Sequence, residues 1–113
     1  MAASGAAGAM PFEMSVDELA RERGATVAVL DVREPWELEI CRLDGSIVIP
    51  LGTLPAHAAQ LPRTGKLVVM CHHGRRSAHA VEWLRANGFP NAINLAGGID
   101  AWARRIDPEM RTY

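Results

Sequence analysis

A single cysteine is followed by a short loop that is rich in basic residues. Cys71 ends the apolar run 66–70, and positions 72–76 carry two histidines and two arginines. The segment after the loop has the pattern of a helix, whose N-terminal N–H groups and dipole favour negative charge. Such surroundings favour the thiolate, which is the reactive form of cysteine. The sequence therefore predicts that Cys71 is a nucleophile.

The elements that must position this cysteine alternate along the chain. Apolar, β-branched runs predict strands at 26–32, 46–49, 66–70 and 91–95. Ser15 and Glu18 have the spacing of a capping box at the start of a helix. The expected helices cover about 15–23, 35–41, 53–60, 76–87 and 99–105. The alternation predicts an α/β fold, with a mostly parallel central sheet of about five strands and helices on both faces.

Ligands of such sheets bind beyond the carboxyl ends of the strands, where Cys71 is expected to lie. Asp31 closes another strand at the same edge. It either lines the pocket or, as we favour, has a supporting role as a buried carboxylate that pairs with Arg33. The three tryptophans lie on expected helices and are interpreted as packing residues, while the first could also wall the pocket: Trp36, Trp83 and Trp102.

Length and composition fit one domain, expected over residues 11–106, with a flexible leader at 1–10 and a tail at 107–113. Of the 113 residues, 49% are hydrophobic and 22% charged, and the net charge of −1 argues against general binding of nucleic acid or of a membrane surface. Residues 1–10 lack the features of a secretory signal, and no apolar run is long enough to span a bilayer. Two cysteines make no disulfide framework. We expect a reduced, cytoplasmic protein.

Four segments in order resemble the single-domain rhodanese family, over about Pro11 to Arg105. They are Asp31–Glu34, Leu43–Pro50, Cys71–Ser77 and Asn94–Trp102. The ending, with Asp107-Pro108 and Tyr113, is similar to rhodanese modules attached to ubiquitin-activating-like adenylyltransferases in sulfur-carrier pathways. This resemblance implies a rhodanese-like α/β fold and a sulfurtransferase.

The resemblance implies that Cys71 takes the outer sulfur of a donor such as thiosulfate and holds it as a persulfide. Cyanide, a thiol or a protein would then accept the sulfur, and no cofactor is implied. A sulfur-carrier protein or a cysteine desulfurase is a possible partner. The substrate-binding set is the loop itself: His72, His73, Gly74, Arg75, Arg76 and Ser77.

Each part of the loop suits that chemistry. Successive N–H groups from His72 to Ser77 can form an anion-binding nest, and Gly74 allows a turn with positive φ. Arg75 or Arg76 can hold the sulfonate end of thiosulfate by charge-assisted hydrogen bonds. We favour Arg76, which lies nearer the helix, but the sequence leaves the choice open.

The loop has three other possible interpretations. Cysteine-dependent phosphatases and arsenate reductases use Cys-x5-Arg, whereas here Ser77 holds the sixth position and Arg76 the fifth. A non-catalytic binding or regulatory module is the second alternative. A metal site is not expected, because the adjacent Cys71, His72 and His73 cannot easily converge on one ion. Cys41 is interpreted as an ordinary packing residue, although it could resolve a persulfide as a disulfide.

Overall fold

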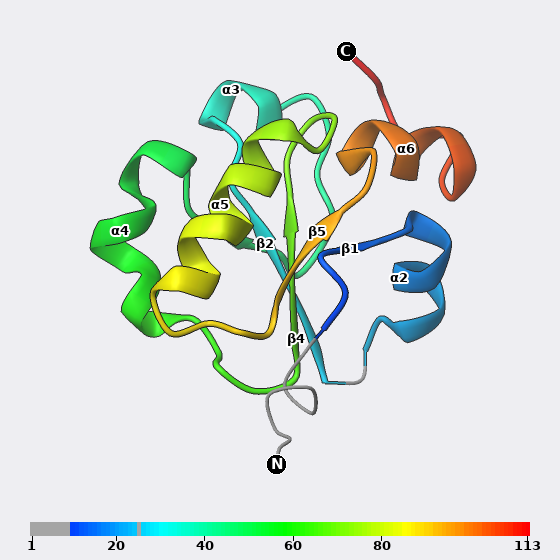
Figure 1. Cartoon of the computed structure of the whole chain (residues 1–113). Helices are drawn as coiled ribbons and strands as arrows, with labels where there is room; N and C mark the ends of the chain where they lie inside the picture. The colour runs from blue at the N-terminus through cyan, green and yellow to red at the C-terminus, as the bar shows by residue number, and fades with distance from the viewer. Residues whose placement is uncertain (1–9, 25) are drawn as a thin grey trace.

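Five parallel strands form one sheet in the computed structural model, which describes residues 10–24 and 26–113 (Figure 1). Their order is β1-β5-β4-β2-β3. The strands are β1 (Glu13–Met14), β2 (Val27–Asp31), β3 (Ile47–Val48), β4 (Lys66–Met70) and β5 (Ala92–Leu95). The parallel sheet and the number of strands confirm the fold expected from the sequence. The predicted leader lies outside the described residues, except for Met10.

Helices cover both faces of the sheet, as expected. They are α2 (Val16–Glu22), α3 (Pro35–Leu38), α4 (Leu54–His57), α5 (Arg75–Ala86) and α6 (Gly98–Arg105). In Figure 1, α4 and α5 lie on one side of the sheet, and α2 and α6 lie on the other. Successive side chains of β4 alternate between two buried clusters, with Leu67 and Val69 in one and Val68 and Met70 in the other. No helix in these described stretches is long and apolar enough to cross a bilayer.

The local sequence signals are confirmed at several element ends. The Ser15 side chain accepts the Glu18 N–H, and the Glu18 side chain accepts the Ser15 N–H, which completes the predicted capping box. Asp31 ends β2 and Cys71 directly follows β4, so both lie at the carboxyl edge of the sheet. The backbone continues this pairing, because Val32 N–H donates to the Met70 carbonyl at 3.0 Å.

Three expectations about elements need correction. β1 was not predicted, because two residues carry too little periodicity, and it forms by pairing with β5. The helix expected to reach Cys41 ends at Leu38, where Arg33 bonds to the carbonyls of Glu37 and Cys41. The helix expected over 53–60 is one α-helical turn between two 3-10 turns, at 51–53 and 58–60.

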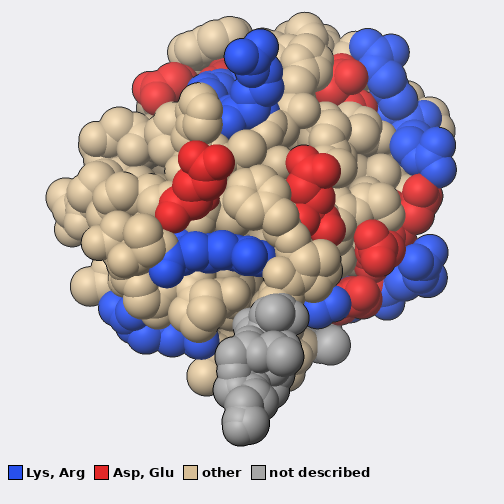
Figure 2. All heavy atoms as spheres, viewed as in Figure 1, with Lys and Arg blue, Asp and Glu red and all other residues tan. Residues whose placement is uncertain are grey.

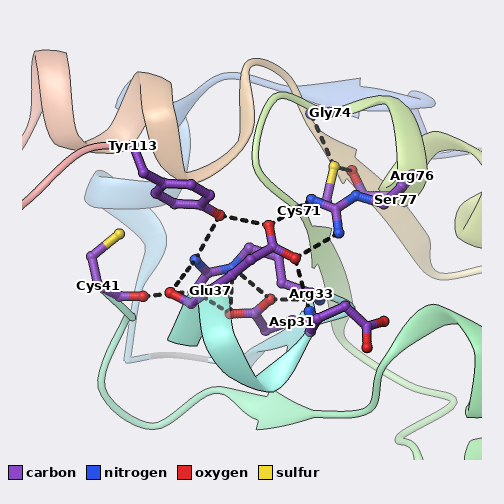
Figure 3. A network of polar contacts seen from close by, with 10 residues as sticks. Asp31, Arg33, Glu37, Cys41, Cys71, Gly74, Arg76, Ser77 and Tyr113 are labelled. Carbon is purple, nitrogen blue, oxygen red and sulfur yellow. Dashed lines mark hydrogen bonds and ion pairs between the residues drawn. The ribbon is translucent and has the colours of Figure 1, made fainter. Parts of the chain in front are cut away.

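The packing role expected for the tryptophans holds in part. Trp102 is buried and Trp83 packs half-buried against the core, but the Trp36 side chain is 60% exposed. Trp36 therefore does not belong to the core. Its ring meets the Tyr113 ring edge-on, with centroids 5.9 Å apart. Residues 107–113 thus bring Tyr113 back to the carboxyl edge of the sheet (Figure 3).

Candidate active site

The Cys71 sulfur is buried at the start of a tight loop. The residue is 1% exposed, and its Sγ accepts the Gly74 N–H at 3.1 Å. The Ser77 hydroxyl, from the first turn of α5, lies 3.2 Å from the same sulfur (Figure 3). Gly74 has φ of +105°, a conformation that glycine adopts without a steric penalty. The turn points a backbone donor and a hydroxyl at the sulfur.

The start of α6 holds the loop from the other side. Ile99 N–H donates to the Cys71 carbonyl at 2.9 Å, and Asp100 N–H donates to the His72 carbonyl at 3.1 Å. Gly98 has φ of +60°, and a Cβ there would overlap both of these carbonyl groups. The Gly97-Gly98 pair therefore both begins the last helix and allows a close approach to the cysteine loop.

The two arginines of the loop have different surroundings. Arg75 is exposed, whereas Arg76 donates two hydrogen bonds of 2.8 Å to the Glu37 carboxylate on α3. The Arg76 hydrogen bonds lower the pKa of Glu37 to about 2, against the opposing effect of burial. The same bonds raise the pKa of Arg76 above its usual value. Arg76 thus reaches the pocket already paired, and Arg75 does not share that carboxylate.

Asp31 and Arg33 form a fully buried ion pair beneath this arginine. Arg33 Nη2 lies 2.8 Å from Asp31 Oδ2, and both side chains have no exposed surface. Burial alone would lower the pKa of Arg33, but the hydrogen bonds with Asp31 and Tyr113 raise it. Asp31 therefore pairs with Arg33, and neither residue lines the pocket beside Cys71.

Tyr113 connects the two ion pairs. Its hydroxyl accepts from Arg33 Nη1 at 3.0 Å and donates to Glu37 Oε1 at 2.8 Å (Figure 3). Burial is the main reason that the pKa of Tyr113 rises to about 12, so the hydroxyl keeps its proton at neutral pH. A polar chain therefore runs from Asp31 through Arg33, Tyr113 and Glu37 to Arg76.

The rings of Tyr113, His72 and His73 form one stack, with His72 in the middle. The His72 ring lies parallel to the Tyr113 ring at 3.7 Å between centroids, and His73 stacks on His72 at 3.9 Å. Burial is the main cause that lowers the pKa of His72, and the neighbouring His73 acts in the same direction.

The side-chain atoms of His72, His73 and Asp100 that could bind a metal ion lie within 4.8 Å of one another. Asp100 also pairs with Arg104 at 2.9 Å.

A pocket of about 200 Å³ opens beside the sulfur and is lined by Cys71, His72, His73, Arg75 and Arg76. One water molecule occupies about 30 Å³ in the liquid, so this space suits a small anion or the end of a chain. The structure thus brings these five predicted residues together at one pocket, and Gly74 and Ser77 contact the sulfur from behind. His57 and His79 are exposed, away from this pocket.

Sequence reasoning missed the residues that hold the loop in place. Glu37 and Glu34 form a capping box at the start of α3. Their spacing in the sequence indicates the start of a helix, but it does not indicate an ion pair between Glu37 and Arg76. Tyr113 and Arg33 are 80 residues apart. The sequence predicts only that Asn94 lies in a strand, whereas in the structure its side chain contacts both Ser77 and Gly74. Their positions depend on the tertiary fold.

Basic and acidic residues are mixed on the surface away from the cysteine pocket. Figure 2 shows basic and acidic side chains interspersed over the face seen in Figure 1. This distribution agrees with the net charge of −1. On this face, the distribution does not resemble the clustered basic surface that polyanion binding requires.

The Rhodanese-like domain model matches residues 15–105. The probable adenylyltransferase/sulfurtransferase MoeZ of Mycobacterium tuberculosis is 37% identical over 81% of this chain. The chain spans only 24% of the length of that relative. A sulfurtransferase of Allochromatium vinosum is 32% identical over 69% of this chain and 73% of its own length.

Solved structures agree with these relatives. The crystal structure of a rhodanese-related protein from Thermoplasma volcanium is 38% identical, with a TM-score of 0.78, and the match covers 83% of this chain and 92% of that one. The family model, the two relatives and this structure agree on one kind of domain. The chain belongs to the rhodanese-like domain family.

Proposed function

We propose that the protein is a sulfurtransferase that carries sulfane sulfur as a persulfide on Cys71. The observation that carries this proposal is the buried Cys71 sulfur, which accepts the Gly74 N–H at the base of a small, cation-lined pocket. Thiosulfate or a persulfide is the proposed donor. The proposed acceptor is cyanide in an assay, or a thiol or a protein in the cell.

The proposed reaction has two covalent steps. The Cys71 thiolate attacks the outer sulfur of thiosulfate, a new S–S bond forms, and the S–S bond of thiosulfate breaks to release sulfite. The acceptor then attacks the outer sulfur of the persulfide, the protein S–S bond breaks, and the thiolate returns with its electron pair. When cyanide is the acceptor, thiocyanate leaves. Splitting the transfer in this way needs a single activated nucleophile and no cofactor.

Arg75 is proposed as the first contact for an anionic donor. Both Arg75 and Arg76 line the pocket, but the Glu37 carboxylate already neutralises the Arg76 charge. An exposed guanidinium can bind a sulfonate by paired, charge-assisted hydrogen bonds. This assignment revises the preference for Arg76 that the sequence alone suggested. Arg76 remains a wall of the pocket.

A protein partner is the second part of the proposal. The adenylyltransferase/sulfurtransferase relative carries both activities in its name, and this chain corresponds to about a quarter of it. A sulfur-carrier protein could therefore accept sulfur from Cys71, and a cysteine desulfurase could supply it. The exposed Trp36, His73 and Arg75 side chains offer contact area near the pocket.

Mass spectrometry of the intact protein after incubation with thiosulfate tests the proposal. We expect a gain of one sulfur atom that maps to the peptide bearing Cys71 and disappears on addition of cyanide. Cys71→Ser should abolish both the gain and thiocyanate formation, while Cys41→Ser, the matched control, should retain both. If Cys71→Ser formed thiocyanate at the wild-type rate, the proposal would be wrong.

Parallel assays separate the proposal from its alternatives. A glutathione persulfide donor should load Cys71 even if thiosulfate is a poor substrate. A chromogenic phosphate ester should give no turnover, because the loop lacks the arginine of the Cys-x5-Arg pattern. Failure of every sulfur donor to load Cys71 would favour a binding module, and turnover of the phosphate ester alone would favour a phosphatase.

A further inference from the structure

A buried serine beside the cysteine sulfur has one hydroxyl hydrogen and two neighbours that can accept it. Ser77 Oγ lies 3.2 Å from Cys71 Sγ and 2.6 Å from Asn94 Oδ1. Ser77 has no exposed surface, and Cys71 and Asn94 are each 1% exposed. Because solvent does not reach the Ser77 hydroxyl, neighbouring protein groups decide which atom receives its hydrogen.

The orientation of the Asn94 amide follows from its other contacts. Asn94 Nδ2 lies 3.1 Å from the Gly74 carbonyl oxygen and 3.1 Å from Glu13 Oε2. A carbonyl oxygen can only accept, so the amide nitrogen must face it. Asn94 Oδ1 is then directed at Ser77, and an amide oxygen can only accept as well. The Ser77 hydroxyl must supply that hydrogen bond.

We propose that Asn94 is a positioning residue that keeps the Ser77 hydroxyl proton away from Cys71 Sγ. Ser77 then accepts a hydrogen bond from the thiol and does not donate one to the thiolate. The short Ser77–Asn94 distance of 2.6 Å, against 3.2 Å to the sulfur, points the same way. This inference deepens the proposed function, because it concerns the charge state of the sulfur that would carry the persulfide.

The consequence differs between the states of the sulfur. A thiolate would face an oxygen lone pair of Ser77, which is unfavourable unless Ser77 turns and leaves Asn94 Oδ1 without a donor. A persulfide has no proton on Sγ to give to Ser77, but its charge lies mainly on the outer sulfur, so the Ser77 lone pair opposes it less than it opposes the thiolate. The Asn94–Ser77 pair therefore favours the thiol and the persulfide over the free thiolate. The rate at which the persulfide is discharged should reflect this preference.

Other charged and titratable groups surround the thiol. The loop and α5 contribute His72, His73, Arg75 and Arg76. Neighbouring elements contribute Glu37 on α3, Glu13 on β1, Asp100 on α6 and Tyr113. Asn94 and Ser77 are both neutral. Substituting Asn94 or Ser77 with another neutral residue therefore leaves all the charged groups around the thiol in place.

The test is the pH dependence of iodoacetamide alkylation, read by mass spectrometry on the peptide that bears Cys71. We expect Asn94→Leu to move the alkylation midpoint down by about one pH unit, because Ser77 becomes free to donate to the thiolate. Ser77→Ala should also move the midpoint down, because it removes the lone pair that faces the sulfur. Discharge of a preloaded persulfide to cyanide should be faster in both variants.

The double variant Asn94→Leu/Ser77→Ala should match Ser77→Ala alone, since Asn94 acts through Ser77. Asn91→Leu is the matched control, because Asn91 is also buried and precedes β5 but bonds to the Pro62 carbonyl. It should leave the midpoint unchanged. In Asn94→Leu the Gly74 carbonyl keeps the Ala78 N–H at 3.2 Å, which favours normal folding.

An unchanged or raised midpoint in folded Asn94→Leu would overturn the inference, as would a raised midpoint in Ser77→Ala. The inference would also be overturned if Asn94→Leu shifted the alkylation midpoint by the same amount in the Ser77→Ala background as in the wild type. If Asn94→Leu did not fold, the sign of the Ser77→Ala shift would decide alone. Alkylation does not require sulfur transfer, so this result stands apart from the fate of the proposed function.

Discussion

The Glu37 carboxylate holds the Arg76 guanidinium through two parallel hydrogen bonds of 2.8 Å each. Glu37 comes from α3, which follows β2, and Arg76 comes from the first turn of α5, which follows β4. The pair therefore ties together two segments at the carboxyl edge of the sheet. It also neutralises one of the two arginines of the pocket, so the two should not be equivalent toward an anionic donor.

The first prediction concerns the two arginines. Arg75→Ala should raise KM for thiosulfate by at least about tenfold, because a charge-assisted hydrogen bond contributes about 1.5–3 kcal/mol and about 1.4 kcal/mol corresponds to tenfold. Arg76→Ala should lower both thiosulfate use and stability, since it leaves the buried Glu37 carboxylate unpaired. Steady-state kinetics and thermal unfolding measure these effects. Arg21→Ala, which removes an exposed arginine from α2, is the control for net charge. An unchanged KM in Arg75→Ala would contradict the proposed contact.

The second prediction concerns pH. The pKa of Glu37 is about 2 in the folded protein, below its ordinary value of 4.5. A lowered pKa in the folded state means that the ion pair stabilises fully above pH 4.5. Its contribution is lost as the pH falls from there toward about 2. Urea unfolding at several pH values should show a shallower loss of stability in Glu37→Gln over this range. Glu39→Gln, exposed just beyond α3, should follow the wild type.

The third prediction separates the hydroxyl of Tyr113 from its ring. Tyr113→Phe keeps the stacking on His72 but removes the hydrogen bonds with Arg33 and Glu37, so it should cost about 1 kcal/mol of unfolding free energy. Tyr113→Ala should cost about 2 kcal/mol, because the ring is lost as well. Denaturant unfolding measures both. Equal stability of the two variants would mean that the ring contributes nothing.

The fourth prediction concerns the buried ion pair. Asp31→Ala should lower the free energy of unfolding by about 3–5 kcal/mol, because the Arg33 charge would stay buried without its carboxylate. Arg33→Met in the same chain should recover part of the loss, since it removes that charge. The measurement is the urea midpoint of each variant. An Asp31→Ala variant as stable as the wild type would show that the carbonyls of Glu37 and Cys41 suffice for Arg33.

The fifth prediction uses three glycines with different surroundings. Gly98→Ala combines a φ of +60° with a clash against the Cys71 and His72 carbonyl groups. Gly45→Ala has φ of +82° but open space, and Gly52→Ala has open space without a positive φ. We expect a negligible loss of stability for Gly52→Ala, about 1 kcal/mol for Gly45→Ala and a larger loss for Gly98→Ala. Of the three, Gly98→Ala alone should also slow persulfide formation, because it displaces the cysteine loop.

The sequence by itself determined the parts of this protein that depend on local patterns. β4 and β5 are mostly apolar, with Lys66 and Asn94 as the exceptions, so their identity follows from side chains that must leave water on both faces of a sheet. The Ser15 capping box and the loop after Cys71 are likewise complete within a few residues. The two-residue β1 and the broken helix at 51–60 were missed, because pairing and packing decide such short elements.

Tertiary structure decided which side chains meet at the sulfur and which charges are neutralised. Nothing in the spacing of the loop shows that Glu37 binds Arg76, that Tyr113 stacks on His72, or that Asn94 faces Ser77. Parallel strands bring their carboxyl ends to one edge, but the order of strands selects which loops become neighbours there. The position of Cys71 after a buried strand, at the carboxyl edge of the sheet, was therefore predictable from its own segment. The hydrogen-bond partners of its sulfur and the different surroundings of Arg75 and Arg76 were not, because they depend on contacts between segments far apart in the chain.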